Sequence, residues 1–357
     1  MMQKMLKNSK IIGYGAYIPK YRIKTEDIAC VWGADAQSIK NGLRIFEKAV
    51  AGADEDTATI GVEATKNALL RAQIKSSNNN IGAIYIGSES HPYAVNPTAT
   101  IIGEAIGLNT NYTAADTQFA CKAGTAAIQM IMGLVESGRI KYGIAIGADT
   151  AQGKPSDALE YSAASGGASF IIGLENEENA VAEILDTCSF STDTPDFWRR
   201  PKEDYPQHAG RFTGVPAYFR HVIGATNLLL KKTNTTIDDY DYFVFHMPNG
   251  KFPLAMAKKY NIPIEKLKQS LVVERIGNTY SGSSLLGLCN CLDIAKPNQK
   301  ILITSYGSGA GADSFAIKIC NGIEKKRNKA KLTEFYINDK EYIDYSIYAK
   351  IRGKYNY

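Results

Sequence analysis

Four polar residues in this 357-residue chain occupy matching positions in two similar stretches of sequence. Glu89 and Cys121 are 32 residues apart, and so are His246 and Asn278. In each pair the first residue follows an apolar, strand-like run and the second lies just before a helix-like run. A thiol, a carboxylate, an imidazole and an amide in one cavity are the groups needed for covalent acyl chemistry with general acid–base catalysis.

Cys121, in DTQFACKAGTAA, is the predicted nucleophile. It starts a helix-like run, and the N–H groups and dipole at a helix N-terminus lower the pKa of a thiol. The other cysteines lie inside strands, helices or plain loops and are predicted to be inert: Cys30, Cys188, Cys289, Cys291 and Cys320. Without CxxC spacing, six scattered cysteines argue against a disulfide scaffold or structural zinc and favour a reducing cytoplasm.

Glu89, in GSESHP, follows an apolar, strand-like run. Loops at the carboxyl ends of strands are where open α/β proteins bind ligands. Apolar walls would raise its carboxyl pKa and suit it to act as a base, although a solvated loop glutamate fits the local sequence equally well. His91 competes for this role but breaks the repeat spacing. His246 ends the run YFVFH, and its repeat relation to Glu89 favours a function over a satisfied core histidine. The four histidines lack HxH or HExxH spacing, so no metal site is predicted.

Two Gly-containing loops complete the candidate site. Asn278, in RIGNTYSGSS, could orient a carbonyl or a water, or simply cap a helix. The run SYGSGAGADSF has no GK[ST] and does not open a helix, which excludes a P-loop or dinucleotide fingerprint. Backbone N–H groups near Gly307, Ser308 and Gly309 are instead predicted to belong to an oxyanion hole.

The elements that must position these residues alternate between short apolar strands and longer helices, which indicates layered α/β structure. Strands are expected at Ile81–Gly87, Tyr142–Gly147, Ala168–Leu174, Tyr242–Phe245, Lys300–Ser305 and Ser314–Ile319. Helices are expected at Asp56–Ala72, Lys122–Glu136, Arg220–Lys231, Pro253–Tyr260 and Ser283–Ile294. Both halves run strand, central helix, strand, Gly-rich turn, strand, which predicts a duplicated unit with the four polar residues around its pseudo-twofold axis. The helix containing AGTAAIQMIMGLV should be buried on all sides.

Length and charge limit the number of domains and the classes of partner. A chain of 357 residues exceeds one ordinary core, so two halves are expected at 1–175 and 176–322, followed by a basic, Tyr-rich, strand-like tail at 323–357. The net charge of +5 is concentrated in that tail, with nine Lys or Arg against five Asp or Glu. The nearly neutral body argues against nucleic-acid binding. No apolar run is long enough to span a membrane, and the N-terminal apolar run from Ile11 resembles a first strand rather than a signal peptide.

Together these residues resemble the thiolase superfamily and, within it, 3-hydroxy-3-methylglutaryl-CoA (HMG-CoA) synthases of the short archaeal type. The resemblance runs from about Ile11 to Ile319 through five motifs in family order: GSES, FACKAGTAA, FHMPNGK, GNTYSGSS and SYGSGAGADSF. It implies a five-layered αβαβα fold of two pseudo-twofold-related halves. It also implies an acyltransferase of the mevalonate (isoprenoid) pathway that uses CoA thioesters as substrates and needs no cofactor.

The resemblance further implies a role for each matching residue. Cys121 would take acetyl from acetyl-CoA, and Glu89 would remove a methyl proton from the acetyl-Cys. The enolate would attack the ketone of acetoacetyl-CoA, which His246 would orient. His246 would then protonate the resulting alkoxide, and water would release the product from Cys121. The positions that match product- or CoA-contacting residues are Asp35, Ala36, Ser165, Thr213, Lys251, Asn278 and Ser308. Longer family members have a second lysine where this chain has Ala255, and Arg211 or Arg200 could substitute for it at the CoA phosphates.

Partners and alternatives also follow from the resemblance. It implies a homodimer, and an assembly with acetoacetyl-CoA thiolase and a small zinc-ribbon/OB-fold protein. The tail would support pairing or docking, or would simply be an edge strand. A ketoacyl synthase III-like enzyme of the same fold is an alternative, but it needs no carboxylate at Glu89. A non-catalytic acyl-CoA-binding scaffold is another, but it has no chemical need for Glu89, Cys121 and His246 together.

Overall fold

The computed structural model describes residues 8–77, 80–151 and 153–353, so the first seven residues of the expected first half and the last four of the expected tail lie outside the described residues. Its largest sheet has nine strands in the order β11-β12-β13-β8-β1-β7-β6-β4-β5. These strands are β1 (Lys10–Tyr17), β4 (Ile81–Gly87), β5 (Thr113–Thr117), β6 (Tyr142–Thr150), β7 (Ser165–Gly173), β8 (Ala182–Thr194), β11 (Tyr242–Phe245), β12 (Lys300–Thr304) and β13 (Gly309–Ile319).

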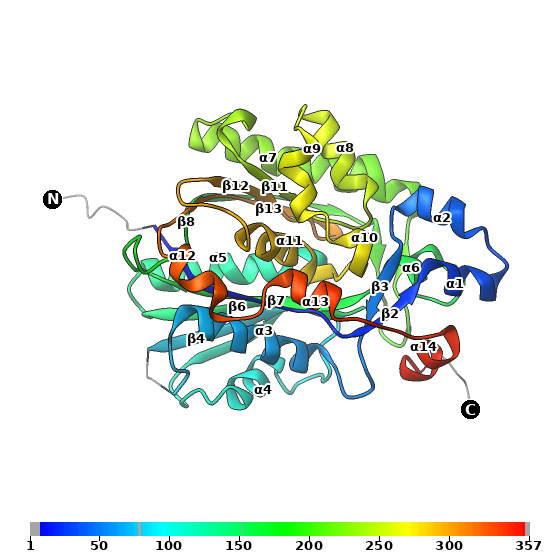
Figure 1. Ribbon diagram of the computed structural model, residues 1–357, viewed down its shortest axis with the longest axis horizontal. Coiled ribbons are helices and arrows are strands. Elements are labelled where there is room, and N and C mark those ends of the chain that lie inside the picture. Colours follow the sequence, from blue (N-terminus) through cyan, green and yellow to red (C-terminus); the bar gives the residue numbers. More distant parts are fainter. Residues whose placement is uncertain (1–7, 78–79, 152, 354–357) are drawn as a thin grey trace.

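Helices cover and separate the two ends of this sheet, which gives the expected alternation of α and β layers (Figure 1). The longer helices are α3 (Thr57–Ala72), α4 (Thr98–Ala105), α5 (Ala123–Glu136), α7 (Arg220–Thr233), α8 (Lys251–Lys259) and α11 (Ser283–Leu292); the short α9 (Ile264–Leu267) and α10 (Val273–Ile276) lie between α8 and α11 in the chain. Helices α3 and α4 lie on one outer face, α5 and α11 between the strand layers, and α7 to α9 on the other outer face. In the described ranges, no helix combines the length and the apolar character needed to cross a membrane.

The two halves repeat the same strand pairings. In the first, β4 and β6 are parallel, β6 and β7 antiparallel, and β7 and β1 antiparallel. In the second, β11 and β12 are parallel, β12 and β13 antiparallel, and β13 and β8 antiparallel. The halves join where β1 pairs with β8. The matching topology agrees with the duplication predicted from the repeat.

The central helices differ in their burial. Every residue of α11 is buried, whereas α5 leaves Met130 40% exposed, so the expectation that α5 is buried on all sides was wrong. The N-terminal end of α5 packs closely against strand ends: a Cβ on Gly87 would lie 2.1 Å from the carbonyl carbon of Ala123. This close approach places the residues just before α5 beside the loop that follows β4.

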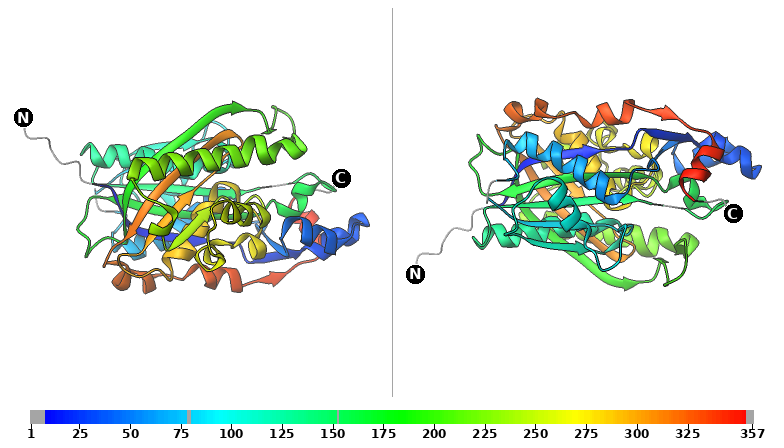
Figure 2. Two further views of the ribbon diagram at one scale, coloured as in Figure 1. Left: turned by 90° about the horizontal axis from the view of Figure 1, so that it is seen from above. Right: turned by 90° about the horizontal axis from the view of Figure 1, so that it is seen from below.

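A small sheet and three helices form the projecting end on the right of Figure 1. The sheet has the order β14 (Glu341–Tyr342), β2 (Tyr21–Lys24), β3 (Glu47–Val50), and α1 (Thr25–Trp32) and α2 (Ala36–Leu43) connect β2 to β3. Figure 2 shows α14 (Tyr345–Ile351) beside this sheet, near the described C-terminal end.

The tail is mostly helical, which corrects the strand-like expectation. After α12 (Ile323–Lys326) and α13 (Thr333–Asn338), only β14 pairs as a strand before α14 begins. The apparent alternation also fits a helix, since Tyr345, Tyr348 and Ile351 are three residues apart and pack on one face. Asp344 caps α14 by accepting a hydrogen bond from the N–H of Ile347 at 2.9 Å.

Candidate active site

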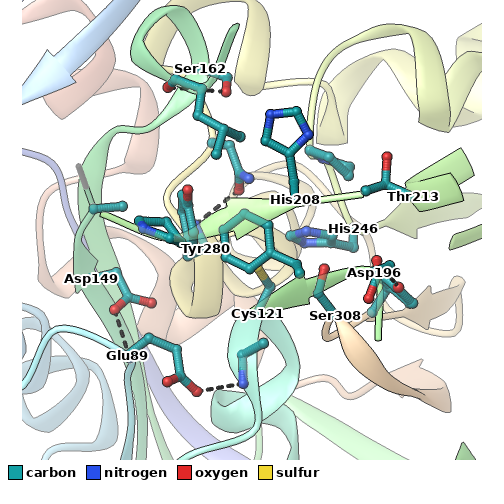
Figure 3. Close-up of a pocket in the computed structure, with 18 of the residues that line it drawn as sticks. Glu89, Cys121, Asp149, Ser162, Asp196, His208, Thr213, His246, Tyr280 and Ser308 are labelled. Atoms are coloured by element: carbon teal, nitrogen blue, oxygen red, sulfur yellow. Dashed lines mark hydrogen bonds between the residues drawn. The ribbon is translucent and has the colours of Figure 1, made fainter. Parts of the chain in front are cut away.

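A cavity of about 690 Å³ lies where the two halves meet, and all four residues with the matching spacing line it (Figure 3). Glu89 follows β4, Cys121 lies in a 3₁₀ turn just before α5, His246 follows β11, and Asn278 precedes α11. Figure 3 shows Cys121 between Glu89 on one side and His246 and Ser308 on the other. Two short paired strands, β9 (Phe197–Trp198) and β10 (Gln207–His208), contribute to the wall of the cavity.

The surroundings of Cys121 raise the pKa of its thiol. Burial is the main cause, followed by the carboxylates of Asp149, Glu89 and Asp196. The prediction of a lowered thiol pKa was therefore wrong, because apolar burial and three nearby acids outweigh the helix N-terminus. The preceding Ala120 has φ 44°, in the left-handed region, so the backbone turns sharply where it presents the sulfur to the cavity.

Glu89 has the raised pKa that the sequence predicts. Burial, followed by the charge of Asp149, raises the pKa of this carboxyl from 4.5 to about 7. Its Oε1 accepts a hydrogen bond from the N–H of Ala120 at 2.5 Å, which ties it to the turn that carries Cys121. A carboxylate with this pKa is half ionised near neutral pH and is suited to take a proton from carbon.

Asp149 links the two halves beside Glu89 and was missed by the sequence reasoning. The carboxylate is 1% exposed. It accepts hydrogen bonds from the hydroxyls of Ser88 and Ser90 at 2.7 Å and from the N–H of Glu89 at 2.9 Å. From the second half, the N–H of Ser281 donates at 2.9 Å. An acid ending the otherwise apolar run YGIAIGAD was the signal available in the sequence.

His246 is a neutral imidazole in this cavity. Burial lowers its pKa to about 3. Within the described residues, its Nδ1 has no hydrogen-bond partner. The hydroxyl of Tyr218 donates to the His246 carbonyl at 2.7 Å and holds this end of β11 in place. Tyr218 lies in a π-helical segment (Gly214–Phe219), an irregularity often found at functional sites.

The Gly-rich turn between β12 and β13 only partly fits the predicted oxyanion hole. The N–H of Gly307 donates to Gly311 at 2.8 Å, and that of Gly309 donates to Asp196 at 2.7 Å, so both are occupied. Asp196 also accepts from Tyr306 at 2.7 Å. Across the described ranges, no other residue accepts a hydrogen bond from the N–H of Ser308 or of Cys121. Within the described residues, these two N–H groups, one from each half, are therefore not taken up by another residue.

The remaining predicted positions divide into two groups. Thr213, Asn278 and Ser308 line the cavity, and its walls do not include Asp35, Ala36, Ser165 or Lys251. Asp35 caps α2 on the surface, Ser165 is buried at the start of β7, and Lys251 is exposed at the start of α8. Of the neighbouring arginines, Arg199 lines the cavity, whereas Arg200 and Arg211 are not part of its walls.

This fold and this cavity define a thiolase-like condensing enzyme. The family model described as 3-oxoacyl-[acyl-carrier-protein (ACP)] synthase III C terminal matches residues 230–319. A hydroxymethylglutaryl-CoA synthase of Methanocaldococcus jannaschii is 60% identical over 96% of this chain and 98% of its own length. One of Archaeoglobus fulgidus is 57% identical over the same shares. The chain belongs to the hydroxymethylglutaryl-CoA synthase family.

Solved structures agree with the fold. An HMG-CoA synthase complexed with CoA has a TM-score of 0.86 at 22% identity, covering 96% of this chain and 90% of that one. A 3-oxoacyl-(acyl carrier protein) synthase III of Pseudomonas aeruginosa has a TM-score of 0.79 at 17% identity, covering 88% and 98%. Both support a thiolase-like fold over the parts of the chain that they cover.

Proposed function

We propose that this chain condenses acetyl-CoA with acetoacetyl-CoA and water to give HMG-CoA and CoA. The observation that carries this proposal is a partly desolvated carboxylate, Glu89, with a pKa of about 7, in one cavity with the thiol of Cys121 and the imidazole of His246. A decarboxylating ketoacyl synthase generates its carbanion by losing CO₂ and needs no such base. Membership in the HMG-CoA synthase family supports the same choice.

The first step is acetyl transfer to sulfur. The Cys121 sulfur attacks the acetyl-CoA carbonyl, and the thiol proton leaves with the departing CoA thiolate. The N–H groups of Cys121 and Ser308 are placed to stabilise the tetrahedral oxyanion. Because the pKa of the Cys121 thiol is raised, the thiolate forms only as the proton is transferred.

The second step forms the carbon–carbon bond. The Glu89 carboxylate takes a proton from the acetyl methyl group, and the resulting enolate attacks the ketone of acetoacetyl-CoA. Neutral His246 orients that ketone and passes a proton to the new alkoxide. The carboxylic acid of Glu89 then returns a proton to His246. Water then cleaves the Cys121 thioester: its hydroxyl joins the acyl carbon, and its hydrogen returns to sulfur.

The direct test is mass identification of the product formed from acetyl-CoA and acetoacetyl-CoA. HMG-CoA is the expected product for the wild-type chain. Glu89→Ala should still acetylate Cys121 but release no condensation product. Condensation by that variant would favour a ketoacyl synthase. If acetyl-CoA does not acetylate Cys121 in the wild-type protein, a non-catalytic scaffold would be favoured.

For substrate binding we propose Thr213, Asn278 and Ser308 in the cavity, and Arg199 at its wall in place of Arg200 or Arg211. Lys251 lies next to the cavity residues Asn249 and Phe252. We therefore propose that it reaches a CoA phosphate from outside the cavity wall.

We also propose the assembly and the location that the resemblance implies. These are a homodimer and a complex with acetoacetyl-CoA thiolase and a small zinc-ribbon/OB-fold protein. Copurification and mass measurement test both. The six cysteines are free thiols, which supports a reducing, cytoplasmic location.

A further inference from the structure

Directly after Cys121, a lysine is buried next to the cavity. The Lys122 side chain is 5% exposed, and its Nζ lies 3.0 Å from Oδ2 of Asp313, which is 0% exposed. The ammonium also lies 4.1 Å from the ring centroid of Phe119. A buried lysine paired with a buried acid is costly to assemble, so such a pair points to a role beyond filling space.

This ion pair crosses between the two halves of the molecule. Lys122 belongs to the turn that carries Cys121, whereas Asp313 lies in β13, just after the turn that carries Ser308. Thr125 at the start of α5 donates to the same Asp313 oxygen at 2.8 Å, and Ser189 of β8 donates to the other at 2.7 Å. Asp313 is therefore held in place by groups from β8, α5 and the turn that carries Cys121.

The lysine stem also packs against the turn that presents Ser308. Gly307 and Gly311 form the paired base of that turn through reciprocal hydrogen bonds of 2.8 and 2.9 Å. A Cβ on Gly307 would lie 2.8 Å from Cγ of Lys122, and one on Gly311 would lie 3.1 Å from its Cε. Both glycines thus lie flat against the side chain that follows Cys121.

We propose that the Lys122–Asp313 pair holds the backbone N–H groups of Cys121 and Ser308 in register, which makes Lys122 a positioning residue for acyl transfer. The proposal rests on the proposed function, because it concerns the oxyanion formed during acetyl transfer and thioester hydrolysis. Two donors supplied by different halves stay aligned only if the halves are fixed at that point. A misplacement of about 1 Å at such a site can cost about 100-fold in rate.

The test compares Lys122→Met with the double variant Lys122→Met/Asp313→Asn and the control Lys326→Met. Lys326 is also 5% exposed, but its ammonium donates to the carbonyls of Ile12 and Ala72, which are not among the cavity walls. Lys122→Met leaves the Asp313 carboxylate buried and unpaired, and the double variant removes that charge.

We expect kcat to fall about 10- to 100-fold in both Lys122 variants, with KM within about threefold of wild type. The double variant should regain most of the melting temperature lost in Lys122→Met without regaining kcat. Lys326→Met should lose melting temperature but keep kcat. Infrared difference spectra of ¹³C-acetylated Cys121 should show a higher carbonyl frequency in the Lys122 variants, since a displaced oxyanion hole polarises the carbonyl less.

Recovery of kcat together with melting temperature in the double variant would overturn the proposal and leave Lys122 a purely structural residue. So would an unchanged kcat in Lys122→Met. Should that single variant fail to fold, the double variant carries the same test. If wild-type protein neither acetylates Cys121 nor forms HMG-CoA, the proposed function fails. If the wild-type protein forms HMG-CoA and the Lys122 variants have the same kcat as Lys326→Met, only the inference about Lys122 is refuted.

Discussion

Replacing Glu89 with Gln should make the protein more stable while it abolishes condensation. Gln has nearly the same shape, and its amide oxygen can still accept the hydrogen bond from the N–H of Ala120. The substitution removes the ionisable group and little else. It therefore separates the free-energy cost of keeping an ionisable group at this cavity wall from the contribution of its contacts.

The size of the effect follows from the pKa of Glu89, raised from 4.5 to about 7 chiefly by burial and then by Asp149. Between these values the folded state holds a proton that the unfolded chain has lost, so the wild-type free energy of unfolding falls as pH rises. Each pKa unit corresponds to about 1.4 kcal/mol, and because Glu89 is partly exposed, solvent screening reduces the full loss to about 1–2 kcal/mol above pH 7. The Gln variant escapes this loss, and its gain should vanish below pH 4.5.

Urea unfolding of both proteins across this pH range measures the gain directly, and mass spectrometry of Cys121 follows acetylation in parallel. We expect acetyl-Cys121 without condensation product at every pH. Glu63→Gln is the control, since that carboxylate is exposed and pairs with Lys66 on the surface of α3. A stability gain that is the same at all pH values, or condensation by Glu89→Gln, would refute the reasoning.

Three further substitutions test neighbouring parts of the site. Cys121→Ala should take no acetyl from acetyl-CoA, and any labelled residue elsewhere would contradict its role as nucleophile. Asp149→Asn removes a charge that raises the pKa of the base carboxylate, so the acidic limb of the condensation pH profile should move to lower pH; an unmoved limb would exclude that coupling. Arg352 donates to the carbonyl of Thr150 in the cavity wall at 2.8 Å, so Arg352→Gln should lower the urea-unfolding free energy by about 1–3 kcal/mol, whereas an unchanged value would mean that this bond contributes little.

Local patterns in the sequence predicted the elements nearest the site well. The strands at Ile81–Gly87 and Tyr242–Phe245 have the expected bounds, and the helix expected at Arg220 begins there. The two strand runs are short, apolar and bounded by polar residues, and the helix run buries residues three and four apart, so hydrophobic periodicity alone identifies them. The equal spacing of Glu89 to Cys121 and His246 to Asn278 predicted a shared cavity because duplication converts sequence position into symmetric placement.

Features that depend on contacts between distant segments were not predictable in this way. Strand β8 was missed because its polar end, SFSTDT, is partly exposed and resembles a loop. Asp149 and Asp196 are held in the site by backbone groups far away in the chain: Ser281 donates to Asp149 from the other half, and Gly309 donates to Asp196 from a distant part of the same half. The raised pKa of Cys121 was missed for the same reason, since those acids approach the thiol only in the folded chain.

The electrostatics of the cavity also disfavour simultaneous negative charge on Cys121 and Glu89. The charge of Glu89 raises the pKa of the Cys121 thiol, and by reciprocity a Cys121 thiolate would raise the pKa of Glu89. Two adjacent anions in this buried site are therefore disfavoured. The resting thiol is therefore neutral beside an ionised Glu89 carboxylate, and the acetyl thioester is neutral as well. In the proposed reaction, no anion on sulfur then competes with Glu89 when it takes a proton from the acetyl methyl group.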